Sequence, residues 1–136
     1  MSVPVPLEEL AAALGRRSNA AYLLTVGDDG RAHCVATTVE WMGGELVVRA
    51  GGTSARNAAG RGNVVLLAPP RGGLAAPPSD EDGYSLIVDA DVTAASSEDG
   101  GTDNVVRVRP THAVLHRPSA APGPRMHDCV HVYDKA

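Results

Sequence analysis

A short run of glycines and hydroxyl residues followed by an arginine is the part of this sequence whose composition most suggests chemistry. The run reads Gly51-Gly52-Thr53-Ser54, and Arg56 follows in a stretch typical of a short helix. Free N–H groups at a helix start attract an anion, a hydroxyl and a guanidinium add donors, and glycine lets the backbone approach closely. The pattern predicts a phosphate site at Thr53, Ser54 and Arg56. The alternative is that Ser54 only caps the helix and Arg56 is a solvated charge.

A second candidate lies near the C-terminus, where His127, Cys129, His131 and Tyr133 alternate with other residues. On a strand these four side chains would share one face. Two imidazoles and a thiol could hold Zn²⁺ or copper if a fourth ligand came from elsewhere. Isolated motifs of this kind are usually accidental, so we predict no metal site and keep a metal-binding tail as an alternative.

The composition limits the classes of partner. Hydrophobic residues make up 43% of the 136 residues but aromatic residues only 3%, with no Phe, so the core must consist of Val, Leu and Ala. Such a core favours strands. The net charge of −4 and the scarcity of rings argue against a nucleic-acid partner.

The chain also lacks the marks of a membrane or secreted protein. No apolar run approaches the roughly 20 residues of a membrane helix, and no basic region precedes an apolar one at the N-terminus. Two cysteines, Cys34 and Cys129, are too few for a disulfide framework. We therefore predict a cytoplasmic protein, with Cys34 as a small core residue of a strand.

Alternation of apolar and polar residues predicts six strands within one domain, residues 1–136. Gly and Asp clusters between them supply hairpin turns. Pro110 indicates an edge or an irregularity in the sixth strand. In the fifth strand, Leu86, Val88, Ala90, Val92 and Ala94 are expected to point inward. The six strands are expected at 20–26, 31–42, 45–50, 63–68, 84–95 and 104–116.

Two helices complete the expected set. Leu residues at helical spacing, with acidic residues before them and arginines after them, predict an amphipathic helix over 6–17. A short helix is expected over 55–59, with Ser54 as its N-cap and Gly60 or Gly62 as its end. Residues 126–133 could add a last short strand. Strands in hairpin order with few helices predict a mainly β protein, a closed or nearly closed antiparallel barrel.

Three segments together resemble a known family. The order AYLLTVGDDGRAHCVATTVEW, GGELVVRAGGTSARNAAGRGNVVLLAPP and YSLIVDADVTA is similar to the FMN-binding split barrels of the pyridoxamine 5'-phosphate oxidase-like family. The most specific part is 54–67, where Ser54 and Arg56 open a short helix and Asn63 starts the next strand. The resemblance covers roughly residues 5–116, the barrel core, and leaves 117–136 as a C-terminal extension.

The resemblance implies a six-stranded antiparallel split β-barrel that forms a homodimer with FMN at the subunit interface. The ring system would lie along two neighbouring strands and the phosphate at the helix start already described. The residues implied as cofactor-binding are Val35, Ala36, Thr37, Arg49, Ala50, Thr53, Ser54 and Arg56.

The function implied is an oxidoreductase in which the flavin carries the chemistry for an unknown small-molecule substrate. The basic and aromatic substrate segment of the pyridoxamine phosphate oxidases has no counterpart here, so vitamin B6 oxidation is not expected, and no catalytic residue is assigned. The alternatives are an 8-hydroxy-5-deazaflavin coenzyme in place of FMN, and a non-catalytic module that binds a flavin or haem.

Overall fold

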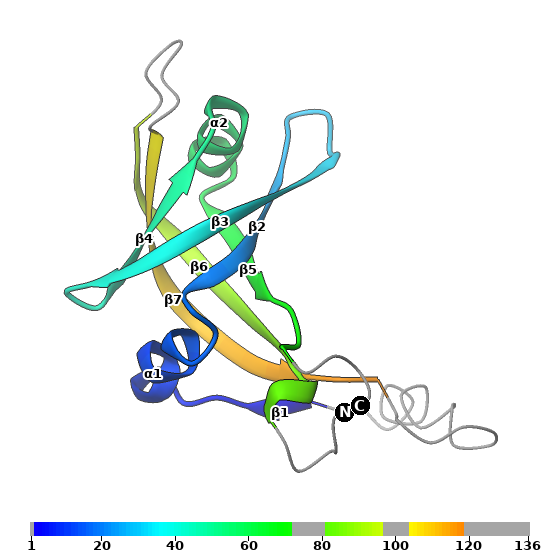
Figure 1. Cartoon of the computed structure of the whole chain (residues 1–136). Helices are drawn as coiled ribbons and strands as arrows, with labels where there is room; N and C mark the ends of the chain where they lie inside the picture. Colours follow the sequence, from blue (N-terminus) through cyan, green and yellow to red (C-terminus); the bar gives the residue numbers. More distant parts are fainter. Residues whose placement is uncertain (1, 72–80, 97–103, 119–136) are drawn as a thin grey trace.

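The computed structural model describes residues 2–71, 81–96 and 104–118. Six antiparallel strands form a closed barrel in the order β7-β4-β3-β2-β5-β6, and β6 pairs with β7 to close it (Figure 1). This confirms the predicted mainly β, six-stranded antiparallel barrel. The strands are β2 (Ala20–Val26), β3 (Ala32–Met42), β4 (Glu45–Ala50), β5 (Asn63–Ala68), β6 (Ser85–Ala95) and β7 (Asn104–His116).

An additional strand, β1 (Ser2–Pro4), was not predicted. It pairs antiparallel with the end of β7, with Ser2 opposite His116 and Pro4 opposite Val114. Three residues are too few to show an alternating pattern, so only the presence of the β7 edge reveals this strand.

One residue of the inward set in β6 was predicted wrongly. The register between β6 and β7 shifts between Val92 and Ala94, which leaves Thr93 as an extra residue. The Thr93 hydroxyl donates to the carbonyl oxygen of Arg107 at 3.2 Å. Because a bulge reverses the alternation beyond it, Ala94 is exposed and Ala95 packs against the core instead.

A second register shift confirms the irregularity expected at Pro110. The pairing passes from Asp89 opposite His112 to Ala90 opposite Pro110, so Thr111 is the extra residue on β7. Its hydroxyl donates to the carbonyl oxygen of Asp89 at 3.1 Å. Each irregularity therefore carries a threonine whose hydroxyl joins the two strands.

The barrel core consists of Val, Leu and Ala, as the composition predicted. Cys34 does not belong to it and is exposed, so its predicted core position is wrong. Cys34 lies opposite Leu24 in the pairing of β2 with β3. On β2 the buried positions are Ala21, Leu23 and Thr25, and since side chains alternate along a strand, the face of Leu24 and Cys34 points out of the barrel.

The first helical segment is shorter than predicted. Instead of one helix over 6–17, the chain forms a 3-10 turn, η1 (Leu7–Glu9), and then α1 (Leu10–Gly15). After α1 the chain turns toward β2, and within this turn Ser18 and Asn19 adopt left-handed backbone angles, with φ of 59° and 52°. Figure 1 shows that α1 lies at the end of the barrel opposite to α2.

The second helix is longer than predicted and starts earlier. It is α2 (Gly52–Arg61), with Gly51 as N-cap, so the assignment of Ser54 as N-cap is wrong. The first helical bond joins the Ala55 N–H to the Gly51 carbonyl at 3.0 Å. Gly62, with φ of 77°, ends the helix in the left-handed conformation that glycine adopts readily.

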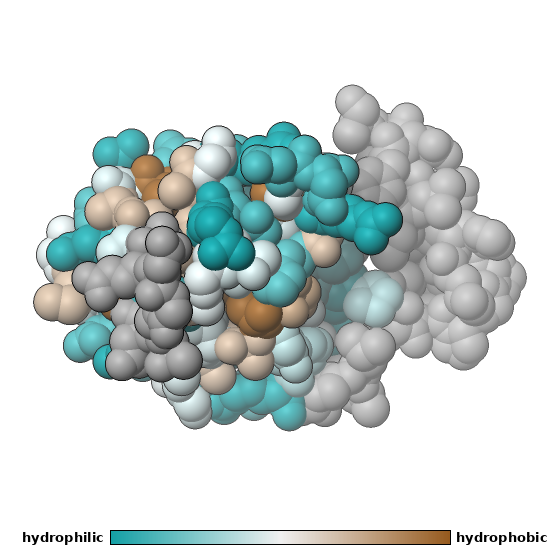
Figure 2. All heavy atoms as spheres, turned by 90° about the horizontal axis from the view of Figure 1, so that it is seen from above, coloured by the Kyte–Doolittle hydropathy of each residue, from teal (hydrophilic) through white to brown (hydrophobic). Residues whose placement is uncertain are grey.

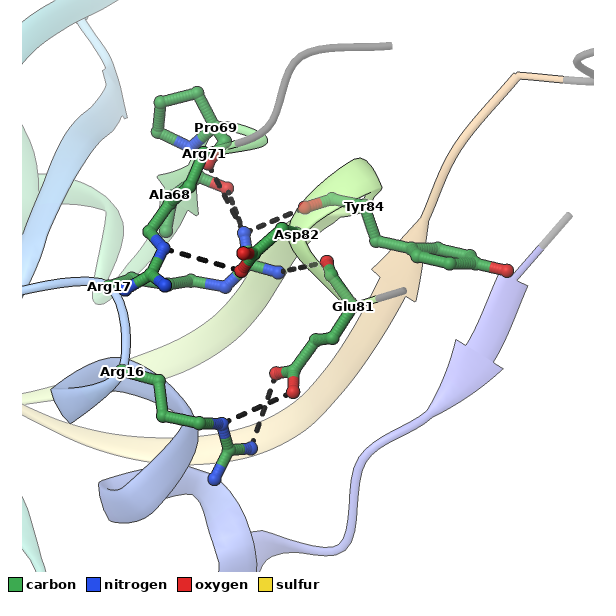
Figure 3. A network of polar contacts seen from close by, with 8 residues as sticks. All are labelled: Arg16, Arg17, Ala68, Pro69, Arg71, Glu81, Asp82 and Tyr84. Atoms are coloured by element: carbon green, nitrogen blue, oxygen red, sulfur yellow. Dashed lines mark hydrogen bonds and ion pairs between the residues drawn. The ribbon is translucent and has the colours of Figure 1, made fainter. Parts of the chain in front are cut away.

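A buried arginine ties α1 to the strand ends near it. Arg17 is 4% exposed, and its guanidinium donates to the carbonyl oxygens of Tyr84 at 2.7 Å, Pro69 at 3.2 Å and Ala68 at 3.4 Å. It also donates to the carbonyl of Glu81 at 2.9 Å, in the 3-10 turn η2 (Glu81–Gly83). Figure 3 shows this guanidinium between the converging carbonyls. Its burial lowers the pKa of Arg17, and the charges of the neighbouring acidic residues oppose that shift.

Two further expectations concern membrane-spanning helices and the C-terminal tail. Among these residues, no helix has the length and apolar character that crossing a membrane requires. The strand expected over 126–133, and with it the tail containing His127, Cys129, His131 and Tyr133, lies outside the described residues.

Candidate functional site

An opening in the barrel wall forms where β3 and β4 separate. The two strands pair from Val39–Val48 to Met42–Glu45, next to the tight turn at Gly43 and Gly44. Before Val39, residues 32–38 of β3 pair with β2, while the end of β4 pairs with β7. One edge of β3 is therefore left facing the end of β4 and the start of α2.

This opening is a groove of about 620 Å³, which is within the roughly 300–1,000 Å³ typical of small-molecule sites. One wall is the free edge of β3, and the other is the segment that runs from β4 into α2. The lining residues are His33, Val35, Ala36, Thr37, Thr38, Arg49, Ala50, Gly51, Gly52, Thr53 and Ser54.

The structure brings the predicted site residues together. Of the eight, seven line the groove, namely Val35, Ala36, Thr37, Arg49, Ala50, Thr53 and Ser54. The eighth, Arg56, stands one turn along α2, and its Nη2 donates to the Thr53 hydroxyl at 3.3 Å. Their role in binding a cofactor stays a prediction.

The β3 wall offers backbone hydrogen-bonding groups. The N–H of Val39 donates to Asn19 at 2.8 Å and that of Gly27 to Arg31 at 2.9 Å, so odd-numbered residues of β3 carry the bonds to β2. In an antiparallel strand the intervening residues direct their N–H and C=O groups to the other side. Ala36 therefore presents both groups to the groove and Thr38 presents its N–H, because the Thr38 carbonyl takes part in the pairing with β4 next to Val39–Val48.

A side-chain hydrogen bond spans the separation of the two strands. The Thr37 hydroxyl donates to the carbonyl oxygen of Arg49 at 2.6 Å. This bond continues the connection between β3 and β4 past Val39, where their backbone pairing stops. It holds the end of β4, and with it the chain that enters α2, at a defined distance from β3.

The start of α2 supplies donors for an anion. The backbone N–H groups of Gly52, Thr53 and Ser54 precede the first helical bond, which Ala55 makes. All three residues line the groove. Ser54 lies on the groove wall, and its hydroxyl bonds to no other residue in the described parts of the chain. This hydroxyl can therefore donate to an acceptor in the groove.

The glycine at the first position of α2 makes room for an arginine. A Cβ at Gly52 would lie 3.3 Å from Nη1 of Arg56 and 3.8 Å from Nδ2 of Asn104. The guanidinium thus folds back over the helix start, close to the free N–H groups. A side chain at position 52 would displace it.

Two arginines near the groove lack carboxylate partners. Arg49 and Arg56 form no ion pair with the described residues, whereas five other arginines do. Arg61 is at the other end of α2 and donates to the carbonyl oxygen of Gly27 at 2.8 Å. Unneutralised guanidinium groups around a helix start favour a bound anion.

Sequence reasoning missed four lining residues: His33, Thr38, Gly51 and Gly52. A signal for His33 was present, because it shares its strand parity with Val35 and Thr37, which were predicted. The glycines were recognised as permitting close approach but were not assigned to the wall. Thr38 follows from the backbone direction on β3, which requires the strand pairing.

The groove continues into two smaller hollows. One, of about 260 Å³, shares Thr38 and Arg49 with it. The other, of about 480 Å³, shares His33 and Thr53 with it and extends to the β2–β3 turn. Figure 2 looks onto the end of the molecule at which α2 lies and shows small hydrophobic patches interspersed among hydrophilic residues.

No metal centre is found in the parts of the chain that the structure describes. There, no three His, Cys, Asp or Glu side chains gather as a metal ion would require.

Comparison with protein-family models finds none that matches this chain. A protein of Mycobacterium bovis called uncharacterized protein Mb0449c is 40% identical over 145 residues, which cover 93% of each chain. The Mycobacterium tuberculosis protein MT0457, also called uncharacterized, matches equally well.

Solved structures share the architecture at low sequence identity. A candidate pyridoxamine 5'-phosphate oxidase from Listeria innocua has a TM-score of 0.56 and 14% identity, covering 81% of this chain and 98% of its own. An F420 reductase gives 0.54 and 19%, covering 80% and 95%. The FAD binding protein from Mycobacterium smegmatis gives 0.53 and 21%, covering 86% and 100%.

The closed barrel with its groove between β3 and β4 is the split-barrel fold of the pyridoxamine 5'-phosphate oxidase-like proteins. Within that fold, the chain belongs to the same family as the two mycobacterial proteins.

Proposed function

We propose that this protein binds FMN in the groove, with the phosphate at Thr53, Ser54 and Arg56. The observation that carries the proposal is that the free N–H groups at the start of α2 and the hydroxyl side chains of Thr53 and Ser54 line one groove. The Arg56 guanidinium, held against Thr53, adds the cation.

The rest of the groove suits a flat ring system. Val35, Ala36 and Thr37 would lie on one side of it, and Arg49 and Ala50 on the other. One edge of a flavin ring carries alternating hydrogen-bond donors and acceptors, and the free edge of β3 offers the N–H and C=O of Ala36 and the N–H of Thr38 to meet them. The groove volume of about 620 Å³ accommodates a ligand of this size.

The names of structural neighbours agree with a flavin-type ligand, since one is an F420 reductase and another an FAD binding protein. The bound flavin would supply the redox chemistry for a small-molecule substrate. The chain would orient and shield it. His33 on the groove wall would offer a ring nitrogen for a hydrogen bond to the ligand.

A homodimer is part of the proposal. The outer face of the barrel is apolar across three strands, where Tyr22 is 41% exposed and lies between Leu67 and Ala36. Ile87 extends this face beyond Leu67. Ala36 also lines the groove, so a second copy seated on this face would cover the groove as well as the apolar area.

The test of the phosphate site compares two ligands on one variant. Arg56→Ala should weaken FMN binding about ten- to a hundredfold, because a charge-assisted hydrogen bond is lost. Riboflavin, which has no phosphate, should bind as before. Quenching of flavin fluorescence gives both affinities. Arg109→Ala is the matched control, since Arg109 is exposed on β7 and pairs with Asp91.

Unchanged FMN affinity in folded Arg56→Ala would show that the phosphate site is misplaced. The same titration separates the alternatives. Tight binding of the 8-hydroxy-5-deazaflavin coenzyme with weak FMN binding would favour a deazaflavin reductase, and a Soret band after addition of haem would favour a haem module.

The homodimer is tested by light scattering at micromolar concentration. The wild-type protein should have the mass of two chains, and Tyr22→Lys should have the mass of one because a charge enters the apolar face. A wild-type monomer that still binds FMN would reject the dimer and leave the groove site standing.

A further inference from the structure

A hollow of about 260 Å³ opens from one end of the groove. It shares Thr38 and Arg49 with the groove. These two residues lie where β3 and β4 separate, next to the part of the wall proposed for the flavin ring. The hollow at the β2–β3 turn shares Thr53 instead, so it adjoins the proposed phosphate site. A molecule in the hollow of 260 Å³ would therefore lie beside the ring and away from the phosphate.

Strand pairing explains why this hollow has an apolar floor. Glu40 lies opposite Val47 across β3 and β4, and Arg49 lies opposite Val105 across β4 and β7. Val48, between Val47 and Arg49, is buried in the core, so these two side chains point out of the barrel. Val47 and Val105 are half-buried, whereas Glu40 and Arg49 are exposed. The hollow thus combines two valines with a carboxylate and a guanidinium.

The two charged side chains of the hollow are not engaged with each other. In the described parts of the chain, neither Arg49 nor Glu40 forms an ion pair or a side-chain hydrogen bond. They occupy diagonal positions on neighbouring strands, where backbones are about 7–8 Å apart, and both border the hollow. The donors of Arg49 are therefore free for an anion that enters this space.

The lining selects among kinds of anion. A guanidinium binds a carboxylate through two parallel hydrogen bonds, and Val47 and Val105 offer apolar contact to an aliphatic chain attached to it. A second carboxylate on that chain would come close to Glu40 and be repelled. The volume equals that of about nine water molecules at about 30 Å³ each, so a chain of about four to six carbons fits. These features favour a short aliphatic acid with one carboxylate.

We propose that this hollow is the substrate subsite of the flavin site and that it takes a short aliphatic monocarboxylate, with the carboxylate on Arg49 and the chain over Val47 and Val105. The assignment as substrate rests on the flavin site proposed above, because the neighbouring ring is what would act on the bound acid. Binding of the acid depends on the residues of this chain and can be measured without flavin.

The first experiment titrates flavin-free, full-length protein with three ligands of equal chain length: pentanoate, glutarate and pentylamine. Saturation-transfer NMR on the ligand signals gives each affinity. Pentanoate should bind at least about fivefold more tightly than glutarate, whose second carboxylate meets Glu40. It should exceed pentylamine by at least as much, because Arg49 repels an ammonium group.

Two substitutions should shift these affinities in opposite directions. Arg49→Gln should weaken pentanoate binding about tenfold through loss of a charge-assisted hydrogen bond. Glu40→Gln should strengthen glutarate binding about three- to tenfold, because the repelling charge is removed, and should change pentanoate binding by no more than about twofold. The matched controls are Arg109→Gln, on the arginine that pairs with Asp91, and Glu8→Gln, on an exposed carboxylate of η1. Neither control should change an affinity.

The second experiment adds pentanoate to protein saturated with FMN. Binding beside the ring should shift the visible absorbance spectrum of the flavin, with the same concentration dependence as the NMR titration. Glutarate at the same concentration should produce a smaller shift.

Pentanoate that does not bind, or that binds Arg49→Gln as tightly as wild-type protein, would overturn the subsite and leave the flavin site to its own test with Arg56→Ala. Pentanoate that binds without changing the flavin spectrum would overturn its place beside the ring. If the protein binds no FMN, the flavin proposal and the assignment as substrate both fail, whereas pentanoate binding that depends on Arg49 would still support the hollow as a site for an acid.

Discussion

Both ends of the barrel hold arginines close to a helix, but these arginines differ in burial and in hydrogen bonding. At the α1 end, Arg17 is 4% exposed and its guanidinium donates to the backbone carbonyls of Ala68, Pro69, Glu81 and Tyr84. These bonds connect the segment after α1 to the end of β5, to η2 and to the start of β6 (Figure 3).

At the α2 end, the arginines are exposed and weakly engaged. Arg56 bonds to the Thr53 hydroxyl at 3.3 Å, and Arg49 forms no ion pair within the described parts of the chain. The N–H groups at the start of α2 precede its first helical bond, and the Ser54 hydroxyl on the groove wall makes no bond to the described residues.

The difference separates an arginine whose donors are used within the fold from arginines that are candidates for binding an anion. A guanidinium whose donors are used within the fold stabilises that fold, because removing it leaves buried carbonyls unbonded. Guanidinium groups beside unused N–H and hydroxyl donors contribute little to folding and remain available for an anion. Substitutions at the two ends should therefore affect different measurements.

The largest effect is expected from Arg17→Met. Several backbone carbonyls would lose their donor, so the free energy of unfolding should fall by about 3 kcal/mol, measured by urea denaturation. The fraction that stays folded should bind FMN with wild-type affinity, since the groove lies at the other end. A loss of FMN affinity larger than threefold in folded protein would show that the two ends are coupled.

The next effect compares two buried hydroxyls. Ser54→Ala should weaken FMN binding about tenfold, through loss of one charge-assisted hydrogen bond, and should leave the free energy of unfolding within about 0.5 kcal/mol. Thr25→Val removes a hydroxyl that accepts from Asn57. It should lower the free energy of unfolding by about 1 kcal/mol and leave FMN affinity almost unchanged. The reverse pattern would contradict the distinction between polar groups bonded within the fold and polar groups left free for a ligand.

A smaller effect is expected from Thr37, whose hydroxyl connects β3 to β4 on the groove wall. Thr37→Val removes the hydrogen bond to the Arg49 carbonyl, so the free energy of unfolding should fall by about 1 kcal/mol. FMN affinity should fall severalfold because the end of β4 is less well held. Thr37→Ser keeps the hydroxyl and should restore the affinity. If Thr37→Ser binds FMN as weakly as Thr37→Val, packing of the methyl group matters rather than the hydrogen bond.

The smallest effect is expected from the exposed ion pair at the α1 end. Arg16 contacts Glu81 at 3.2 Å, with side-chain exposures of 55% and 32%. Since such pairs contribute little in water, Arg16→Ala should lower the free energy of unfolding by no more than about 0.5 kcal/mol, and less at 1 M salt. A loss comparable to that of Arg17→Met would mean that the network acts as one unit.

Much of the fold could be read from the sequence, since alternation and turn residues are local properties. The expected strand over 45–50 coincides with β4, and that over 63–68 with β5. The errors occurred where distant segments decide the outcome. The bulge at Thr93 depends on the register with β7, and the outward direction of Cys34 depends on which face of β2 is buried.

The candidate site likewise has features that the sequence predicts and features that depend on strand pairing. The sequence by itself determined the chemistry at the start of α2, because two glycines, two hydroxyls and an arginine at this spacing create anion donors wherever the helix lies. Only the tertiary structure decided that β3 leaves β4 before Val39, that Thr37 bridges the separation, and that His33 joins the wall. These features arise from strand pairing between segments far apart in the chain, and no local pattern of residues encodes where such pairing ends.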